Sequence, residues 1–206
     1  PSILNLSLYI NLPILLTLLL LTVSLLSYST SLFYINQINL LLNINFIEIK
    51  NSFNLIDKVS LIIQTCLLMG TMGVVPGHEL THRVKNKFDM FIGNWLLAFS
   101  CDCTFAIEHV YGHHRNACFP EDPASAKKGE NIYLFILKAI INEHIDGWKI
   151  EAKRVKRTGD FPYGFNNKMI IGYLRSLTIG SFAFLIGGWS GVVFFLICAF
   201  ITKSFL

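Results

Sequence analysis

The sequence predicts an all-α integral membrane protein, a transmembrane helix bundle with a cytoplasmic region that carries two histidine clusters. Of the 206 residues, 53% are hydrophobic and 15% are charged, whereas soluble domains carry about 25% charged residues. Five of the six histidines fall in two short stretches, HELTH at 78–82 and HVYGHH at 109–114. The first observation predicts a bilayer environment, and the second predicts a chemical site inside it.

Apolar runs predict about four membrane spans. Residues 12–35 and 59–77 each supply roughly the 20 apolar residues that a bilayer core requires. Residues 169–206 have room for two short spans hinged near Gly187–Gly188. The Asn-rich stretch 36–57 is expected to be a loop between the first two spans.

The chain is expected to be a fragment, because it begins with Pro1 and ends at Leu206 inside an apolar run. Neither an internal repeat nor a linker rich in Pro or Ser divides it. Residues 1–206 are therefore expected to form a single membrane domain.

The basic residues predict the orientation in the membrane. Of 17 Lys and Arg residues, 13 lie between Arg83 and Lys168, and the positive-inside rule places such a region in the cytoplasm. Five cysteines without a CxxC pair fit the same reducing side. The partners predicted from composition are the lipid bilayer and a hydrophobic substrate, and no nucleic acid is expected.

The segment between the two histidine clusters decides whether they can meet. Residues 82 and 109 are 27 positions apart, about 40 Å as one straight helix, which exceeds the roughly 30 Å of a bilayer core. If residues 88–107 crossed the membrane, the clusters would lie on opposite sides. Interruptions at Gly93–Asn94 and Asp102 predict instead that this segment lies along the interface or folds back.

Residues 130–154 have the helical periodicity of an amphipathic segment. They fit either an interfacial helix or a soluble helix packed on the domain. Ser125 is a possible N-cap for this helix. His144 within it is expected to be a surface group and not a ligand.

The histidine spacing predicts a metal site. Residues four apart share a helix face, and His114 projects about 100° from its neighbour His113. Neutral imidazole is the commonest protein metal ligand and suits Fe, Zn and Cu. The predicted ligands are His78, His82, His109, His113 and His114.

A rival interpretation comes from HELTH, which is a literal H-E-x-x-H motif. In zinc proteases the two histidines bind Zn and the glutamate, here Glu79, is the general base. A membrane zinc metalloprotease needs one further ligand and leaves the three histidines of 109–114 unexplained. Their number favours a site richer than three ligands, such as a pair of irons that activates O2 and acts on a hydrophobic chain.

The residues GHELTHR at 77–83 and EHVYGHHRNACFPEDPASAKKGE at 108–130 resemble the first two histidine boxes of the membrane alkane 1-monooxygenase (alkane hydroxylase) family. That family is close to xylene monooxygenase and related to membrane fatty acid desaturases. The second match is specific, because it continues into PEDPASAKKGE, a stretch that generic desaturases lack. The resemblance covers roughly residues 59–170. It departs from the family at Ala117–Phe119, where V-A-T is usual, which bears on substrate range.

The resemblance implies a six-span enzyme with two non-haem iron ions, which inserts one oxygen atom of O2 at a terminal carbon. Electrons would come from rubredoxin and its NAD(P)H-dependent reductase. The implied location is the bacterial inner membrane, with the histidine boxes facing the cytoplasm. The alternative within the same histidine-box class is a membrane fatty-acyl desaturase or hydroxylase.

Carried onto this chain, the resemblance makes the five clustered histidines iron ligands. Glu79 and Glu108 match the family pattern, and hydrogen bonds from them to imidazoles are the expected role. No histidine follows His144, so the remaining ligands are expected beyond Leu206. This fragment alone is therefore expected to be inactive.

Overall fold

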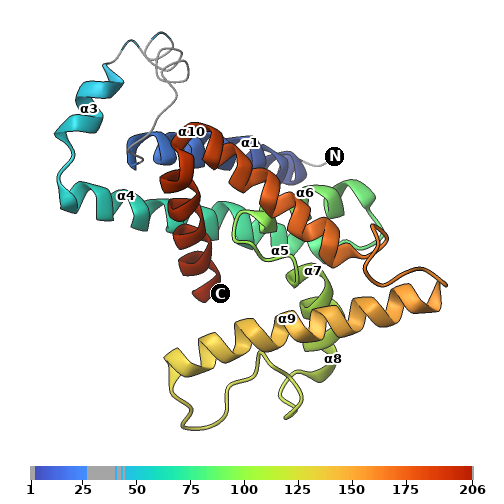
Figure 1. Cartoon of the computed structure of the whole chain (residues 1–206). Coiled ribbons are helices and arrows are strands. Elements are labelled where there is room, and N and C mark those ends of the chain that lie inside the picture. Colours follow the sequence, from blue (N-terminus) through green and yellow to red (C-terminus); the bar gives the residue numbers. More distant parts are fainter. Residues whose placement is uncertain (1–2, 27–39, 41–42, 44, 206) are drawn as a thin grey trace. The chain divides into compact units, whose positions relative to one another are not determined.

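The computed structural model describes residues 3–26, 40, 43 and 45–205. Throughout these residues the regular elements are helices, and no strand occurs among them, which confirms the all-α prediction. The chain forms two compact units (Figure 1). Unit 1 comprises Pro1–Val75 with Leu177–Leu206, and unit 2 comprises Pro76–Ser176.

Unit 1 is built from long apolar helices. The helix α1 (Ile3–Leu26) packs against α4 (Leu55–Leu68) and against η1 (Met69–Val74), a stretch of wider π-helix that continues α4. The hydroxyl oxygens of Thr22 and Thr65 lie 3.0 Å apart across this contact. Hydroxyl pairs of this kind hold helices together where lipid offers no hydrogen-bonding partner.

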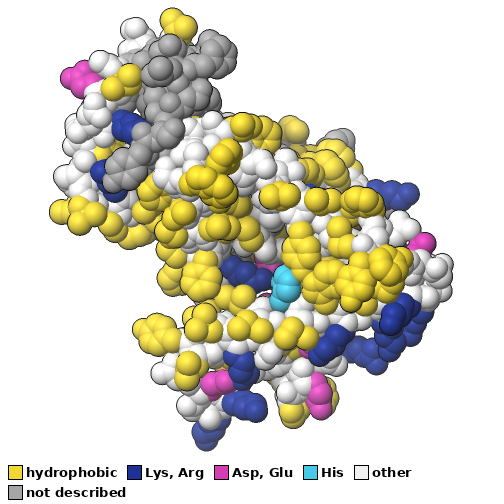
Figure 2. Space-filling model, in the orientation of Figure 1, with side chains coloured by type: hydrophobic (Ala, Val, Ile, Leu, Met, Phe, Trp, Pro, Cys, Tyr) yellow, Lys and Arg dark blue, Asp and Glu magenta, His cyan; other side chains and the backbone are white. Residues whose placement is uncertain are grey.

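Among the described residues, three helices are long and apolar enough to cross a membrane, namely Leu6–Leu26, Leu55–Thr81 and Lys168–Ser204. Figure 2 shows hydrophobic side chains over the visible side of unit 1, where a soluble protein would bury them. The first helix begins at Ile3 and not at the predicted residue 12, because isolated Asn and Ser residues in an apolar run do not end a helix. Residues 27–35 of the predicted span lie outside the described residues.

The helix α10 (Lys168–Ser204) bends at Gly188, which has φ 58° and ψ −150°. This confirms the predicted hinge near Gly187–Gly188. A Cβ on Gly191 would collide with the Ala183 carbonyl oxygen and with Val23, so the two parts of the helix approach each other closely beyond the bend. In unit 1 the Thr202 hydroxyl also donates to the Cys66 carbonyl at 3.3 Å, which ties α10 to α4.

The prediction of a loop over residues 36–57 is wrong for its second half, which contains α3 (Phe46–Ser52) and the start of α4. Two of the asparagines that suggested a loop, Asn45 and Asn54, are helix caps. Asn45 accepts from the Glu48 N–H, and Asn54 forms a capping box with Asp57, which satisfies N–H groups that a helix start leaves free. Residues 36–39, 41–42 and 44 lie outside the described residues.

Unit 2 begins with a helical hairpin. The helix α5 (Val75–Thr81) is followed by α6 (Lys87–Ala98), which is about 18 Å long and so too short to cross a bilayer. Gly77 and Gly93 face each other in this hairpin, because a Cβ on either would touch the other's carbonyl oxygen. Gly93–Asn94 is therefore a close packing contact, and the prediction of a helix break there is wrong.

The chain turns back at residues 99–104, where Cys101 adopts φ 53°, and this turn confirms the predicted fold-back. It leads into α7 (Phe105–Glu108), the π-helical turn η2 (His109–His113) and α8 (His114–Asn116). The short helices α7 and η2 pack on α9 (Ile132–Arg157). This arrangement returns the second histidine cluster to the end of α5.

The amphipathic helix predicted over 130–154 is α9, but its N-cap is Asn131 and not Ser125. Asn131 is the N-cap because its side chain lies directly before the first turn and accepts from two N–H groups there. Figure 2 shows Lys and Arg side chains gathered along the C-terminal part of α9. The buried Glu151 binds Arg154 and the Lys168 backbone N–H, which joins α9 to the start of α10.

Replacing Gly188 by Ala should destabilise the protein by about 1–3 kcal/mol, because φ 58° with ψ −150° is a glycine conformation. The midpoint of thermal unfolding in detergent measures this. Gly180→Ala is the matched control, since a Cβ there makes only ordinary contact with Phe195. Equal stability of the two variants would contradict a glycine-dependent bend.

Candidate metal centre

The two histidine clusters meet in unit 2. The Nε2 atoms of His78 on α5 and His109 on η2 lie 3.0 Å apart, although the residues are 31 positions apart in the chain. The Nε2 atom of His114 lies 3.0 Å from the same atom of His109. The predicted meeting of the clusters is therefore present in the structure.

The nitrogen atoms converge closely enough to hold a metal ion. One ring nitrogen from each of His78, His82 and His109 lies within 4.8 Å of the other two. The His114 ring is 5.0 Å from that of His82, and the His113 ring stacks on that of His109 at 5.3 Å. All five predicted ligands therefore belong to one group of imidazoles.

The protonation chemistry of this group fits a cation. A neutral imidazole has one N–H, so His109 Nε2 cannot donate to both His78 and His114. Burial and then the neighbouring histidines lower the pKa of His109 to about 4, which keeps the ring neutral at pH 7. Without a metal ion, His78 and His114 can each donate an Nε2–H to the lone pair of His109 Nε2. With a metal ion, the three nitrogens would instead offer their lone pairs, and neutral imidazoles are ligands that iron and zinc accept.

The two glutamates of the motifs lie beside the histidines. Glu79 accepts a hydrogen bond from Arg83 at 2.9 Å. Glu108 is 3% exposed, and its Oε1 has no hydrogen-bond partner among the described residues. Burial, followed by nearby Glu143 and Asp122, raises the pKa of Glu108 to about 8. The role expected of both, steadying imidazoles, stays a prediction.

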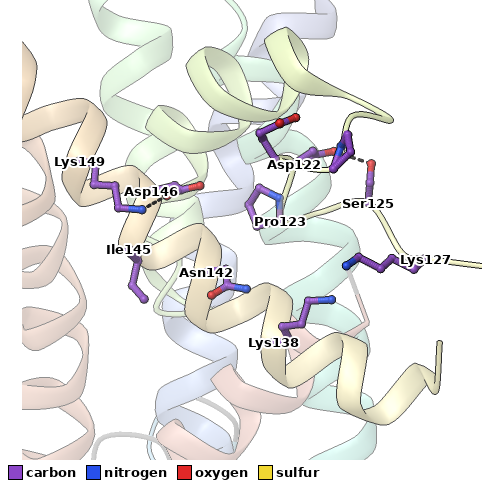
Figure 3. A pocket seen from close by; sticks show the side chains of 11 residues that line it. Asp122, Pro123, Ser125, Lys127, Lys138, Asn142, Ile145, Asp146 and Lys149 are labelled. Atoms are coloured by element: carbon purple, nitrogen blue, oxygen red, sulfur yellow. Dashed lines mark hydrogen bonds and ion pairs between the residues drawn. The ribbon is translucent and has the colours of Figure 1, made fainter.

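Asp122 makes the kind of contact that was expected of the glutamates. Its Oδ2 lies 2.9 Å from His113 Nδ1, and the carboxylate is 4% exposed. The Ser125 hydroxyl and the Ala124 N–H donate to it, as Figure 3 shows for Asp122 and Ser125. Burial raises the pKa of Asp122, but hydrogen bonds from Ser125, His113 and Ala124 outweigh it, so the pKa lies below its ordinary value.

Sequence reasoning missed Asp122. It identified PEDPASAKKGE as part of a motif, but it offered Ser125 only as a helix cap. In the structure Ser125 instead accepts from the Cys118 N–H and donates to Asp122. The available signal was a carboxylate in a proline-bracketed turn nine residues after His113.

The loop that carries Asp122 is seated over α9. A cleft of about 230 Å³ separates them, and Figure 3 shows Pro123 and Asp122 on the loop side and Asn142 and Asp146 on the helix side. The loop thus faces α9 across this cleft, and its Asp122 holds His113.

His144 has other partners. It is half-buried on α9, and its Nε2 hydrogen-bonds the Tyr173 hydroxyl, which also accepts from Trp148 Nε1. The expectation of a surface group therefore misjudged its burial. The residue takes part in the contact between α9 and the start of α10.

Comparison with known proteins shows that both histidine clusters lie in a region that matches a protein family. The model of the fatty acid desaturase family matches residues 59–206. The chain is 35% identical over 156 residues to alkane 1-monooxygenase 1 of Pseudomonas aeruginosa, which covers 73% of this chain and 39% of that protein. It is 32% identical over 150 residues to alkane 1-monooxygenase 2 of Alcanivorax borkumensis, with the same two shares.

A further relative is the xylene/toluene monooxygenase hydroxylase component of Pseudomonas putida. It is 31% identical over 107 residues, or 52% of this chain and 29% of that protein. The chain thus spans less than half the length of these relatives. Because the family match covers more than half of the chain and includes both histidine clusters, the protein is an integral membrane protein that belongs to the fatty acid desaturase family.

Proposed function

We propose that this chain forms the first part of the iron site of an alkane 1-monooxygenase, an O2-dependent enzyme that hydroxylates the terminal carbon of hydrophobic chains. The observation that carries the proposal is the convergence of His78, His82 and His109 from two remote segments. The three relatives named above, all of them called monooxygenases, support the reaction type.

The residues that would hold iron are His78, His82, His109, His113 and His114. Two iron ions are the number that the resemblance implies, and bound iron would supply activation of O2. The protein's own contribution is to keep the imidazoles neutral and oriented. In the overall reaction one oxygen atom enters the C–H bond, and the other leaves as water, with two electrons from the donor and two protons from the solvent.

The substrate we propose is an alkane-like chain. The described helices that are long enough to cross a membrane are apolar, and a chain without polar groups is recognised by shape and dispersion contacts alone. The proposed electron donor is rubredoxin with its NAD(P)H-dependent reductase. Lys and Arg residues of unit 2 support a cytoplasmic orientation of the site in a bacterial inner membrane, which is the side where such a donor is available.

A second candidate is a fatty-acyl desaturase or hydroxylase, which the description of the matching family favours. Product analysis separates the two. The complete protein that carries these residues, supplied with a reducing system and labelled O2, should convert an n-alkane to a terminal alcohol containing one labelled oxygen. A new double bond in an acyl chain, without labelled alcohol, would refute the hydroxylase and support the desaturase.

His113→Ala should lower the iron content of the complete protein and abolish turnover, because it removes an imidazole from the converging group. Metal analysis by mass spectrometry measures iron per chain independently of activity. His144→Ala is the control, since His144 binds Tyr173. Full iron content in His113→Ala would contradict its assignment as a ligand, and one zinc per chain in the unaltered protein would point to the protease.

Asp122→Asn should reduce iron affinity by about 10–100-fold, the usual effect of losing a carboxylate behind a ligating histidine. The ionised carboxylate at Nδ1 favours the tautomer whose Nε2 lone pair is free for metal. Iron retention during chelator titration and the Mössbauer spectrum of the remaining iron are the measurements. Glu121→Gln, the same charge change on the exposed neighbour, should leave both unaltered, and an unaltered Asp122→Asn would exclude this positioning role.

A further inference from the structure

Unit 2 contains a second cavity, which has a volume of about 490 Å³ and whose lining residues include none of the five clustered histidines. One face of α6 lines it through residues spaced three and four apart, and the first two turns of α10 line it opposite. Val84, Ala106 and Ile107 complete the wall. The α6 residues are Lys87, Met90, Phe91 and Asn94, and the α10 residues are Lys168, Ile171 and Arg175.

Most of the cavity wall is apolar. Phe91 and Val84 leave about half of their surface exposed, while Ile107 is buried. Volumes of 300–1,000 Å³ with mainly apolar walls and a few placed polar groups are typical of small-molecule sites. The wall between α6 and α10 therefore suits an alkyl chain.

Three cationic side chains also line this cavity. Among the described residues, Lys87, Lys168 and Arg175 form no ion pair with an acidic side chain. The nearby acids are otherwise engaged, since Asp89 pairs with Arg83 and Glu151 with Arg154.

Arg175 is the most informative of the three. It is partly buried, and a guanidinium has five N–H donors. In the described part of the chain its hydrogen bond goes to Asn94 Oδ1, at 3.5 Å. Burying a guanidinium that makes a single long hydrogen bond costs free energy. An anion with several acceptor oxygens would supply the missing hydrogen bonds, because it fits the planar arrangement of the guanidinium N–H groups.

The position of the cations in the membrane helix selects the ligand. Lys168 begins the apolar helix α10, and Arg175 lies seven residues later, about 10 Å along the axis. The cations thus lie near the polar end of the helix, next to its apolar part. A phospholipid has the same arrangement, since its phosphate adjoins an apolar acyl chain. Basic pockets at the cytoplasmic ends of membrane helices hold anionic headgroups in this way.

We propose that this cavity binds one anionic phospholipid, with its phosphate on Lys87, Lys168 and Arg175 and one acyl chain between α6 and α10. The site is distinct from the imidazole group and does not depend on the proposed enzyme activity. Its expected effect is to hold α6 and α10 together at the membrane surface.

The test compares two variants of the purified protein in nanodiscs that contain phosphatidylglycerol or phosphatidylcholine. Native mass spectrometry should show one retained phosphatidylglycerol on the unaltered protein. The triple variant Lys87→Gln, Lys168→Gln, Arg175→Gln should retain it at least about tenfold less, since each cation near anionic lipid contributes roughly 1 kcal/mol. The control triple Lys153→Gln, Lys156→Gln, Arg157→Gln makes the same charge change on α9 and should retain it fully.

A second variant tests the apolar half of the cavity. Ile171→Trp places a bulkier side chain in the wall between α6 and α10 and keeps all three cations, so it should also weaken lipid retention while the circular dichroism spectrum is maintained. Equal loss in the two triple variants, equal retention of phosphatidylcholine, or retention of a free fatty acid in place of a phospholipid would overturn the proposal. Undiminished retention in the first triple variant would overturn it as well.

Discussion

The close approach of His78 and His109 is the constraint on which the rest of unit 2 depends. Two imidazole Nε2 atoms 3.0 Å apart require that α5 lies beside the start of η2. The hairpin of α5 and α6 makes this possible, because Gly77 and Gly93 let the two backbones approach closely. The turn after Ala98 then sends the chain back toward α5 before it could cross a membrane.

Each histidine cluster is held in place by different contacts. Around the first, the glycine contact positions α5, and Arg83 engages Glu79. Around the second, η2 is a π-helical turn, a local widening that is frequent at functional sites. The buried carboxylate of Asp122 then fixes one ring through Nδ1. The orientation of the His113 ring thus comes from the loop that carries Asp122.

The two units differ in polarity. Unit 1 has long apolar helices tied by hydroxyl and thiol contacts such as Thr22–Thr65, while unit 2 carries most of the charge and the proposed chemistry. Where they are joined covalently, α10 changes from a helix end rich in cations to an apolar span. At this helix end Glu151 of α9 accepts from the Lys168 N–H. The cavity beside Arg175, which has both cationic and apolar lining residues, lies at the same end.

The sequence by itself determined the membrane character, the hinge near Gly188, the amphipathic α9 and the identity of the clustered histidines. These follow from composition, from residue spacing along a helix and from motif resemblance, all of which are local in the chain. Only the tertiary structure decided that Gly93 is a packing contact, that Asn45 and Asn54 cap helices, and that Asp122 holds His113. The Gly93 contact depends on which surfaces pack together, and it has no signature in the spacing of residues along α6. The asparagine caps and the contact of Asp122 with His113 join residues that are close in the chain, but Asn and Asp suit a loop as well as they suit these roles, so the sequence did not select between them.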